Sequence, residues 1–370
     1  MITVNSDLFF WVQIIAQKLF LHLSEHHCIK FIDYSRKHST QVKAIIPVAG
    51  AGTKLRPLTY TQPKALIPIA GKTILSVIVD QLIEAGITEF IFVIGYLGEK
   101  IQDYVANQYP HLNCSFVTQN DRKGTGHAIW LTKEYINNEE IIIVLGDTIC
   151  DYDLKQVLIS PVSLIGVQKV DDPRNFGVAE LGDNDAVLHV IEKPTIPKSN
   201  MAMVGIYYIK ETKTLFDALD MVLQKEPTLS GEYPLTNAIE IMVSSKSVRF
   251  DAFRVNTWFD CGKKETLLTT NATLLKKTDN QSANEQESTV IIHPVSIAKG
   301  CVIKNSIIGP NVTIGEATKI EFSIIKNSII GSYAELEDVL LHGSIIGNDA
   351  YVRGSSQSLN IGDNTEIDLR

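Results

Sequence analysis

The feature of this sequence that most constrains its fold is a short aliphatic repeat toward the C-terminal end. Ser-Ile-Ile-Gly occurs three times and the near copy Ser-Ile-Ile-Lys once, at 306–309, 328–331, 344–347 and 323–326. Aliphatic residues recur every six positions, at Ile291, Ile297, Ile303 and again at Ile308, Ile314, Ile320. Such a repeat is typical of a parallel β-helix, in which each short strand forms one side of a triangular coil. A β-sandwich would instead show a period of two, with turns about every eight to twelve residues.

Residues 43–260 carry a different pattern, in which apolar runs alternate with helical periodicity. This pattern indicates βαβ units and a mostly parallel sheet. The expected strands are 44–48, 89–94, 140–145, 163–167, 187–191 and 204–209. The expected helices are 74–85, 126–135 and 211–223.

The length and composition indicate more than one domain. A chain of 370 residues is too long for one ordinary hydrophobic core. Residues 276–288 contain one aliphatic residue, Ala283, and no aromatic residue, as expected of a flexible solvated linker. We therefore divide the chain into an N-terminal extension, an α/β domain, a linker and a β-helix, at 1–41, 42–275, 276–288 and 289–370.

The N-terminal extension contains an apolar segment at 8–23 that is interrupted by Lys18 and other polar residues. It is too short and too polar to span a bilayer, and it lacks the flanks of a signal peptide. It predicts an amphipathic helix that packs on the protein or on a partner, and its polar face is not basic enough for a membrane surface. An alternative is that the native chain starts at Val42, which an intact mass near 41 kDa would exclude.

Charge and cysteine content exclude several classes of protein. A net charge of −8 argues against a nucleic-acid-binding protein, which usually has a basic excess. The five cysteines form no C-x-x-C pair, so they predict reduced thiols in a cytoplasmic protein and not a disulfide framework or a zinc site.

The loop after the first expected strand predicts a phosphate-binding site. It carries Gly50 and Gly52, and the cations Lys54, Arg56 and Lys64 follow within a short stretch. Glycines let backbone N–H groups approach a phosphate closely, and fixed cations balance its charge.

Two familiar phosphate-binding motifs are excluded at this loop. A dinucleotide-binding fingerprint requires a third glycine where Leu55 stands. Gly71-Lys72-Thr73 imitates the end of a P-loop, but the glycine required five residues earlier is replaced by Leu66.

The loop as a whole resembles the signature of the sugar-1-phosphate nucleotidyltransferases, G-x-G-T-R-L-x-P-x-T followed by P-K-x-L-x-P. The matching residues are Gly50, Gly52, Thr53, Leu55, Pro57, Thr59, Pro63, Lys64, Leu66 and Pro68. The resemblance extends over roughly residues 43–275 and departs at Lys54, where the family has an arginine. Arg56 is a candidate for part of that arginine's role, although a lysine point charge does not replace a planar guanidinium fork.

The resemblance implies a fold and a set of phosphate contacts. The fold is a Rossmann-like, mostly parallel α/β sheet with flanking helices, followed by a left-handed parallel β-helix of about four turns. Gly50, Ala51, Gly52, Thr53 and Arg56 would bind the nucleotide. Lys54 and the glycine loop would hold the departing pyrophosphate, and Lys64 would neutralise the reacting phosphates.

Two aspartates are expected to bind Mg²⁺. Asp147 follows the apolar run 141–145, at the end of a strand where α/β sheets bind ligands, although a Gly-Asp pair alone usually forms a turn. The resemblance identifies Asp147 as a metal ligand and Asp260, in Trp-Phe-Asp-Cys-Gly, as the second. Two carboxylates suit Mg²⁺, which also binds phosphates and keeps some waters.

The resemblance also implies sugar contacts. Lys193 would hold the sugar phosphate and Glu192 a sugar hydroxyl, whereas Gly177, Asn200 and Gly205 match further sugar-binding positions.

Base recognition is expected from Gln119 and the loop containing Gly124 and Thr125. A glutamine amide both donates and accepts, so it can pair with the edge of a pyrimidine. His127 is interpreted as a residue at a helix N-terminus, because a phosphate monoester is already an anionic nucleophile and needs no general base.

The implied activity is nucleotidyl transfer from a nucleoside triphosphate to a sugar 1-phosphate, with dTTP favoured over UTP and glucose 1-phosphate as the favoured sugar. The residues expected to carry catalysis are Lys54, Lys64, Asp147, Lys193 and Asp260. Alternatives are uridylyl transfer to glucose or N-acetylglucosamine 1-phosphate, and guanylyl transfer to mannose 1-phosphate. A catalytically weak regulatory subunit is the non-enzyme alternative, which Lys54 favours.

The β-helix is expected to serve in oligomerisation or regulation, with a homo-oligomer formed through it or through the α/β domain. Acyl transfer is a further alternative, for which His293 and His342 are the available bases.

Overall fold

The computed structural model describes residues 42–228, 231–246, 248–277 and 288–354. The expected N-terminal helix and most of the expected linker lie outside these residues. No helix in the described ranges has both the length and the apolar character that a membrane span requires. The four cysteines within them, Cys114, Cys150, Cys261 and Cys301, are free thiols.

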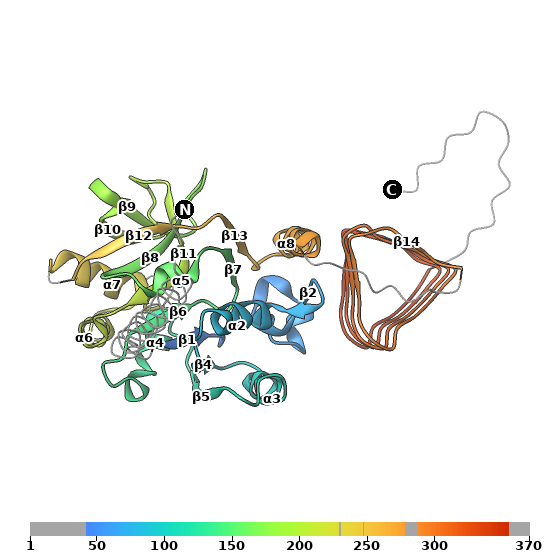
Figure 1. Ribbon diagram of the computed structural model, residues 1–370, viewed down its shortest axis with the longest axis horizontal. Helices are drawn as coiled ribbons and strands as arrows, with labels where there is room; N and C mark the ends of the chain where they lie inside the picture. The colour runs from blue at the N-terminus through green and yellow to red at the C-terminus, as the bar shows by residue number, and fades with distance from the viewer. Residues whose placement is uncertain (1–41, 229–230, 247, 278–287, 355–370) are drawn as a thin grey trace, which may run out of the picture. The chain divides into compact units, whose positions relative to one another are not determined.

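The centre of the first part is a block of four parallel strands in the order β6-β1-β4-β5 (Figure 1). Their bounds are β1 Lys43–Pro47, β4 Glu89–Ile94, β5 Asn113–Thr118 and β6 Ile141–Val144. All four residues of β6 are buried, as is typical of parallel strands covered on both faces. Because the strands are parallel, their carboxyl ends lie along one edge of the sheet, and the loops that follow them converge there.

The sheet continues in antiparallel strands beyond β6. Strand β11 pairs antiparallel with β6, β8 and β9, while β10 pairs with β9, and β12 pairs parallel with β8. Their bounds are β8 Ser163–Lys169, β9 Gly177–Leu181, β10 Val187–Glu192, β11 Met201–Ile209 and β12 Phe250–Arg254. The sheet is therefore mixed, with a parallel core and an antiparallel extension.

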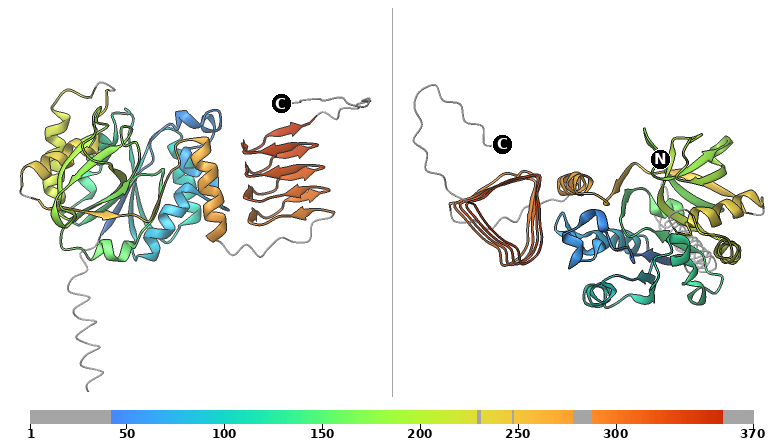
Figure 2. Two further views of the ribbon diagram at one scale, coloured as in Figure 1. Left: turned by 90° about the horizontal axis from the view of Figure 1, so that it is seen from above. Right: turned by 180° about the vertical axis from the view of Figure 1, so that it is seen from behind.

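Helices pack on both faces of this sheet (Figure 2). Side chains of α4, α6 and α7 share one hydrophobic core with Ile45, Ile143 and other strand residues. The helices are α2 Ile74–Glu84, α3 Gly98–Gln108, α4 Thr125–Trp130, α5 Leu154–Leu158, α6 Thr212–Leu223, α7 Leu235–Ser244 and α8 Lys264–Lys277. Two small sheets complete this part, β2 Pro68–Ile69 with β3 Lys72–Thr73, and β7 Thr148–Asp151 with β13 Thr257–Asp260. Single-turn 3₁₀ helices lie at Thr53–Leu55, Leu58–Tyr60, Lys64–Leu66, Lys133–Tyr135 and Asp183–Asp185.

The six expected strands are confirmed with small shifts of their ends, but the single helix expected at 126–135 is wrong. Helix α4 ends at Trp130, and a separate 3₁₀ turn follows at Lys133–Tyr135. Both the amide and the hydroxyl of Thr132 donate to the carbonyl of Ile129, at 2.9 and 2.7 Å. These tight local bonds replace the next α-helical bond and end the helix.

The second part is a left-handed parallel β-helix, as expected. Three sheets of four strands each form its sides, with strand orders β14-β17-β20-β23, β15-β18-β21-β24 and β16-β19-β22-β25. The strands are Val290–Ile291, Val295–Ile297, Val302–Lys304, Ile307–Ile308, Val312–Ile314, Lys319–Glu321, Ile324–Lys326, Ile329–Ile330, Glu335–Glu337, Leu340–His342, Ile345–Ile346 and Tyr351–Arg353. The interior is a stack of aliphatic side chains from all three sides, which includes Ile303, Ile308 and Ile314.

The turns of the β-helix are shorter than a strict six-residue repeat on every side would give. Ile307 pairs with Ile324, so that turn takes 17 residues, and Ile324 pairs with Leu340, so the next takes 16. The six-residue spacing seen in the sequence therefore holds along two sides of the 17-residue turn but along only one side of the 16-residue turn.

One buried side chain of α8 links the two parts. The Oδ1 atom of Asn271 accepts hydrogen bonds from the Ala70 amide at 2.8 Å and the Thr313 hydroxyl at 2.7 Å. Its Nδ2 donates to the carbonyl of Asn311 at 3.3 Å. Asn271 and Thr313 are both buried, so this amide joins the β2–β3 turn, α8 and the β-helix without access to water.

We expect Asn271→Leu to lower the free energy of unfolding by about 1–3 kcal/mol, because the buried hydroxyl of Thr313 and the partly buried backbone groups of Ala70 and Asn311 lose their partner. Denaturant unfolding measures this change. Thr273→Ala in the same helix is the control, since the Thr273 hydroxyl bonds only to the carbonyl of Thr269 among the described residues. Equal stability of the two variants would contradict the role of Asn271.

Candidate active site

The glycine-rich loop after β1 is shaped by its contacts with the segment around Lys64. Gly52 has a φ of +60°, and a Cβ there would lie 2.9 Å from Thr59 Cγ2 and 3.0 Å from Lys64 Cβ. The hydroxyl of Thr59 donates to the carbonyl of Gly52 at 2.8 Å. Apart from its chain neighbours, no described residue has an atom within 4 Å of a Cβ built on Gly50, so its backbone faces open space.

An ion pair joins this loop to the end of β6. Lys64 Nζ lies 2.5 Å from Asp147 Oδ2, with side chains 15% and 40% exposed. Gly146 makes this approach possible, because a Cβ there would lie 2.3 Å from Val48 Cγ1 and 2.9 Å from the carbonyl oxygen of Pro47. The amide of Gly146 donates to that same carbonyl at 3.2 Å.

Strand pairing brings the second expected metal ligand beside the first. Asp260 pairs with Thr148 across β13 and β7, and the amide of Cys261 donates to the carbonyl of Asp147 at 3.0 Å. Both aspartates line one cavity. The described residues hold no group of three or more His, Cys, Asp or Glu side chains placed for a metal. The two aspartates alone would supply two carboxylates, a donor set that fits Mg²⁺, which binds through one or two carboxylates together with substrate phosphates.

Cys261 lies between these aspartates and α8 but does not supply a thiolate. Burial raises the pKa of its thiol to about 12. The free thiol is therefore protonated at neutral pH.

The antiparallel half of the sheet contributes two consecutive charged residues, Glu192 and Lys193, at the end of β10. The hydroxyl of Thr236 donates to Glu192 Oε2 at 2.7 Å, which fixes the carboxylate at the end of β10. Lys193 has a φ of +43°, and its Nζ lies 3.5 Å from Glu192 Oε1. The Phe176 ring packs edge-on against Trp258 with centroids 4.8 Å apart and forms part of the same wall.

The parallel half contributes an amide beside the loop that precedes α4. Gln119, just after β5, is 6% exposed, and its Nε2 donates to the carbonyl of Gly124 at 3.1 Å. The loop itself is held by α7, because Leu235 donates its amide to the hydroxyl of Thr125 at 3.0 Å. His127 is the third of the six residues of α4, so this short helix places it in the last turn as well as near the N-terminus.

Two adjoining cavities of about 440 and 430 Å³ form one cleft at the carboxyl edge of the sheet. Fifteen of the residues proposed from the sequence line it: Gly50, Ala51, Gly52, Thr53, Lys54, Lys64, Gln119, Gly124, Thr125, Asp147, Gly177, Glu192, Lys193, Gly205 and Asp260. The structure therefore gathers loops from distant parts of the chain around one site.

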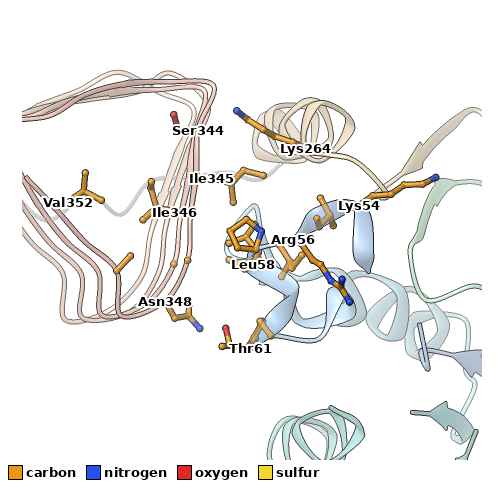
Figure 3. A pocket seen from close by; sticks show the side chains of 18 residues that line it. Lys54, Arg56, Leu58, Thr61, Lys264, Ser344, Ile345, Ile346, Asn348 and Val352 are labelled. Atoms are coloured by element: carbon orange, nitrogen blue, oxygen red, sulfur yellow. The ribbon is translucent and has the colours of Figure 1, made fainter. Parts of the chain in front are cut away.

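Arg56 and Asn200 are not among the residues that line the cleft. Arg56 lies over the Tyr60 ring, with Cζ 5.0 Å from its centroid, and it lines a different pocket between the loop and the last turns of the β-helix (Figure 3). Lys54 lines both spaces, and its side chain extends away from the β-helix in Figure 3. Asn200 is exposed, and its carbonyl accepts from the amide of Val170 at 3.0 Å.

Arg122, Asn175 and Thr236 line the cleft although sequence reasoning did not single them out. Arg122 was detectable as a cation just before the Gly124 loop, and its guanidinium lies 5.4 Å from the centroid of Tyr96. Asn175 stands two residues before Gly177. Thr236 left no local signal, because its position opposite Glu192 arises only from the packing of α7 on β10.

Comparisons with known proteins agree with this arrangement. A family model described as "Nucleotidyl transferase" matches residues 43–277. The "Low-salt glycan biosynthesis nucleotidyltransferase Agl11" of Haloferax volcanii is 30% identical over 89% of this chain and 100% of its own length. A "Glucose-1-phosphate thymidylyltransferase" of Streptomyces antibioticus is 26% identical over the same shares. A solved structure of "UDP-glucose pyrophosphorylase complexed with UDP-glucose" is 26% identical with a TM-score of 0.56, over 64% of this chain and 99% of that one.

The fold and the cleft together define a sugar-1-phosphate nucleotidyltransferase. The chain belongs to the nucleotidyl transferase family, through residues 43–277. The non-enzyme alternative is not supported by these findings.

We expect Gly146→Ala to lower the free energy of unfolding by about 1–3 kcal/mol, because the added methyl group overlaps Val48 and the backbone of Pro47. Gly50→Ala is the matched control and is expected to change the stability by no more than about 0.5 kcal/mol, since its Cβ meets nothing. Thermal and denaturant unfolding check both values. A Gly146→Ala variant as stable as Gly50→Ala would show that the close approach of β6 to β1 is not required.

Proposed function

We propose that this protein transfers a nucleotidyl group from dTTP or UTP to a hexose 1-phosphate, with glucose 1-phosphate as the favoured acceptor, and releases pyrophosphate. The observation that carries the proposal is the cleft lined by the glycine loop, three lysines and two aspartates. The thymidylyltransferase and UDP-glucose pyrophosphorylase among the similar proteins support the choice of substrates.

In the proposed reaction, an oxygen of the sugar phosphate attacks the α-phosphorus of the nucleotide. The bond from that phosphorus to the bridging oxygen breaks, and pyrophosphate leaves with the electron pair. Both reactants are anions, so charge repulsion is the main obstacle, and the protein has to supply alignment and positive charge. Lys64 and Lys193 line the cleft from opposite halves of the sheet and supply that charge.

Each half of the sheet is assigned one substrate. The loop at Gly50–Thr53 and the amide of Gln119 bind the nucleotide, and Lys54 stabilises the departing pyrophosphate. Glu192, held by Thr236, accepts a hydrogen bond from a sugar hydroxyl, and Lys193 beside it binds the sugar phosphate. The backbone at Gly177 and Gly205 lines the sugar side.

Asp147 and Asp260 are the residues that would hold Mg²⁺. The ion supplies positive charge to the phosphate oxygens when bound there. Lys64 already lies 2.5 Å from Asp147, so the lysine keeps the carboxylate oriented toward the cleft before any substrate enters.

Asp147→Asn is expected to lower kcat by on the order of 10³-fold, the scale seen when a key electrostatic group is removed. Release of pyrophosphate from the nucleotide in the presence of glucose 1-phosphate measures the loss. Asp151→Asn is the control, because Asp151 lies at the far end of β7 and pairs with Lys277 at 2.7 Å outside the cleft. Near-normal turnover by the Asp147 variant would refute the metal assignment.

Thr236→Val is expected to raise KM for the sugar 1-phosphate about three- to tenfold, with KM for the nucleotide unchanged, because Glu192 loses the hydroxyl that orients it. Ser244→Ala is the control, since it removes a hydroxyl-to-carboxylate bond to Glu240 in the same helix. Initial rates with each substrate varied in turn check the prediction. An equal rise in both KM values would argue against a sugar-specific role.

The substrate pair is tested by a panel of nucleotides against glucose, mannose and N-acetylglucosamine 1-phosphates, with pyrophosphate release as the readout. The proposal requires the largest kcat/KM with dTTP or UTP and glucose 1-phosphate. A preference for GTP with mannose 1-phosphate would overturn it.

A further inference from the structure

The amide of Gln119 is enclosed on its nitrogen side by two acceptors. Its Nε2 donates to the carbonyl of Gly124 at 3.1 Å and lies 3.0 Å from His127 Nδ1. A carbonyl oxygen only accepts, so the end of the amide that faces Gly124 is the NH₂ group. The chemistry of its neighbours therefore fixes the orientation of the amide.

His127 completes this arrangement in its neutral form. A neutral imidazole with its proton on Nε2 presents a lone pair at Nδ1, and that lone pair accepts the second amide hydrogen of Gln119. Burial lowers the pKa of His127, which keeps the ring neutral at physiological pH. With both hydrogens engaged, Gln119 Oε1 is the part of the amide left to bind a ligand, and Gln119 lines the nucleotide side of the cleft.

The imidazole is itself held in place. It stacks on the Trp130 ring with centroids 6.2 Å apart and planes inclined by 18°. The indole N–H of Trp130 donates to Asp220 of α6 at 2.7 Å, so the stack is tied to a neighbouring helix.

We propose that His127 is a positioning residue for base selection, which together with Gly124 locks the Gln119 amide so that its oxygen faces the base. Such an acceptor pairs with a base that carries a ring N–H on its pairing edge, as uracil and thymine do at N3. Cytosine and adenine present a ring nitrogen lone pair instead, and two facing acceptors repel each other. This inference rests on the proposed function and concerns the nucleotide half of the same cleft.

The lock is sensitive to pH. Protonation places an N–H at Nδ1 against the NH₂ group of Gln119, so two donors face each other and the amide loses its fixed orientation. The charged groups that act on His127 are Lys123, which lowers its pKa, and Asp121, which raises it. Asp220 of α6 lies behind Trp130, where Lys133 also binds it at 2.7 Å. Because the imidazole must be neutral, the selection is complete above the pKa of His127 and is lost as the pH falls through it.

Two variants separate the hydrogen bond from the packing of the ring. His127→Phe keeps an aromatic ring on Trp130 but removes the acceptor, and His127→Asn offers a carbonyl oxygen near the position of Nδ1. We expect His127→Phe to raise KM for UTP and dTTP about three- to tenfold, with kcat within about twofold of the parent. His127→Asn is expected to restore KM to within about twofold.

The ratio of kcat/KM for UTP to kcat/KM for CTP is a sharper readout than KM alone. Both nucleotides carry the same triphosphate, so the effect of its titration on the rate cancels in the ratio. In the parent enzyme the ratio is expected to fall as the pH is lowered below the ordinary histidine range, whereas in His127→Asn it stays constant. This pH profile of the parent enzyme also tests the inference if His127→Phe does not fold.

The outcomes distinguish this inference from the proposed function. A parent enzyme that turns over neither UTP nor dTTP with any sugar 1-phosphate overturns the proposed function, and the inference with it. An active parent enzyme whose UTP-to-CTP ratio is independent of pH, or a folded His127→Phe variant with unchanged KM, overturns the inference alone. A His127→Asn variant as impaired as His127→Phe also overturns it, because packing and not the acceptor would then be responsible.

Discussion

The site depends on one contact, the ion pair between Lys64 and Asp147. It spans 83 positions of sequence, yet its atoms lie 2.5 Å apart because β1 and β6 are adjacent parallel strands whose following loops leave from the same edge. A lysine held by a carboxylate has little freedom left to lose when a phosphate arrives. The pair therefore holds the Lys64 ammonium group in place within the cleft. The Asp147 carboxylate meanwhile offsets the repulsion between Lys64 and the neighbouring lysines.

The change of strand direction at β11 separates two sets of cleft residues, one from the parallel strands and one from the antiparallel strands. Loops that follow parallel strands carry the glycine turn, Gln119 and Asp147, which we propose bind the nucleotide. The antiparallel extension carries Glu192 and Lys193, which we propose bind the sugar phosphate. Since α7 contacts Glu192 through Thr236 and the Gly124 loop through Leu235, one helix supports both halves. The position of α7 thus couples the two binding regions.

Much of the fold could be predicted from the sequence because its signals are periodic. The apolar runs of β1, β4 and β6 and the repeat of the β-helix need only local spacing to be recognised. Strands β7 and β13 were missed because they are short and pair only with each other, far apart in the chain. Helix α4 ends where the Thr132 hydroxyl donates to the carbonyl of Ile129. The spacing of apolar residues in the sequence carries no information about this hydrogen bond.

The site was predictable where a residue belongs to a loop motif and not where packing places it. Lys64, Asp147 and Lys193 were predicted in this way, and all three line one cavity of the structure. Arg56 carries the right charge in the right loop, but its guanidinium lies over Tyr60.

The buried amide of Asn271 is hydrogen-bonded to residues of both the α/β part and the β-helix. It binds the turn that follows the Lys64 segment on one side and the wall of the β-helix on the other. The strands of the β-helix are themselves hydrogen-bonded to neighbouring strands along three sides. The aliphatic repeat that builds this coil therefore also supplies partners for a buried amide of α8.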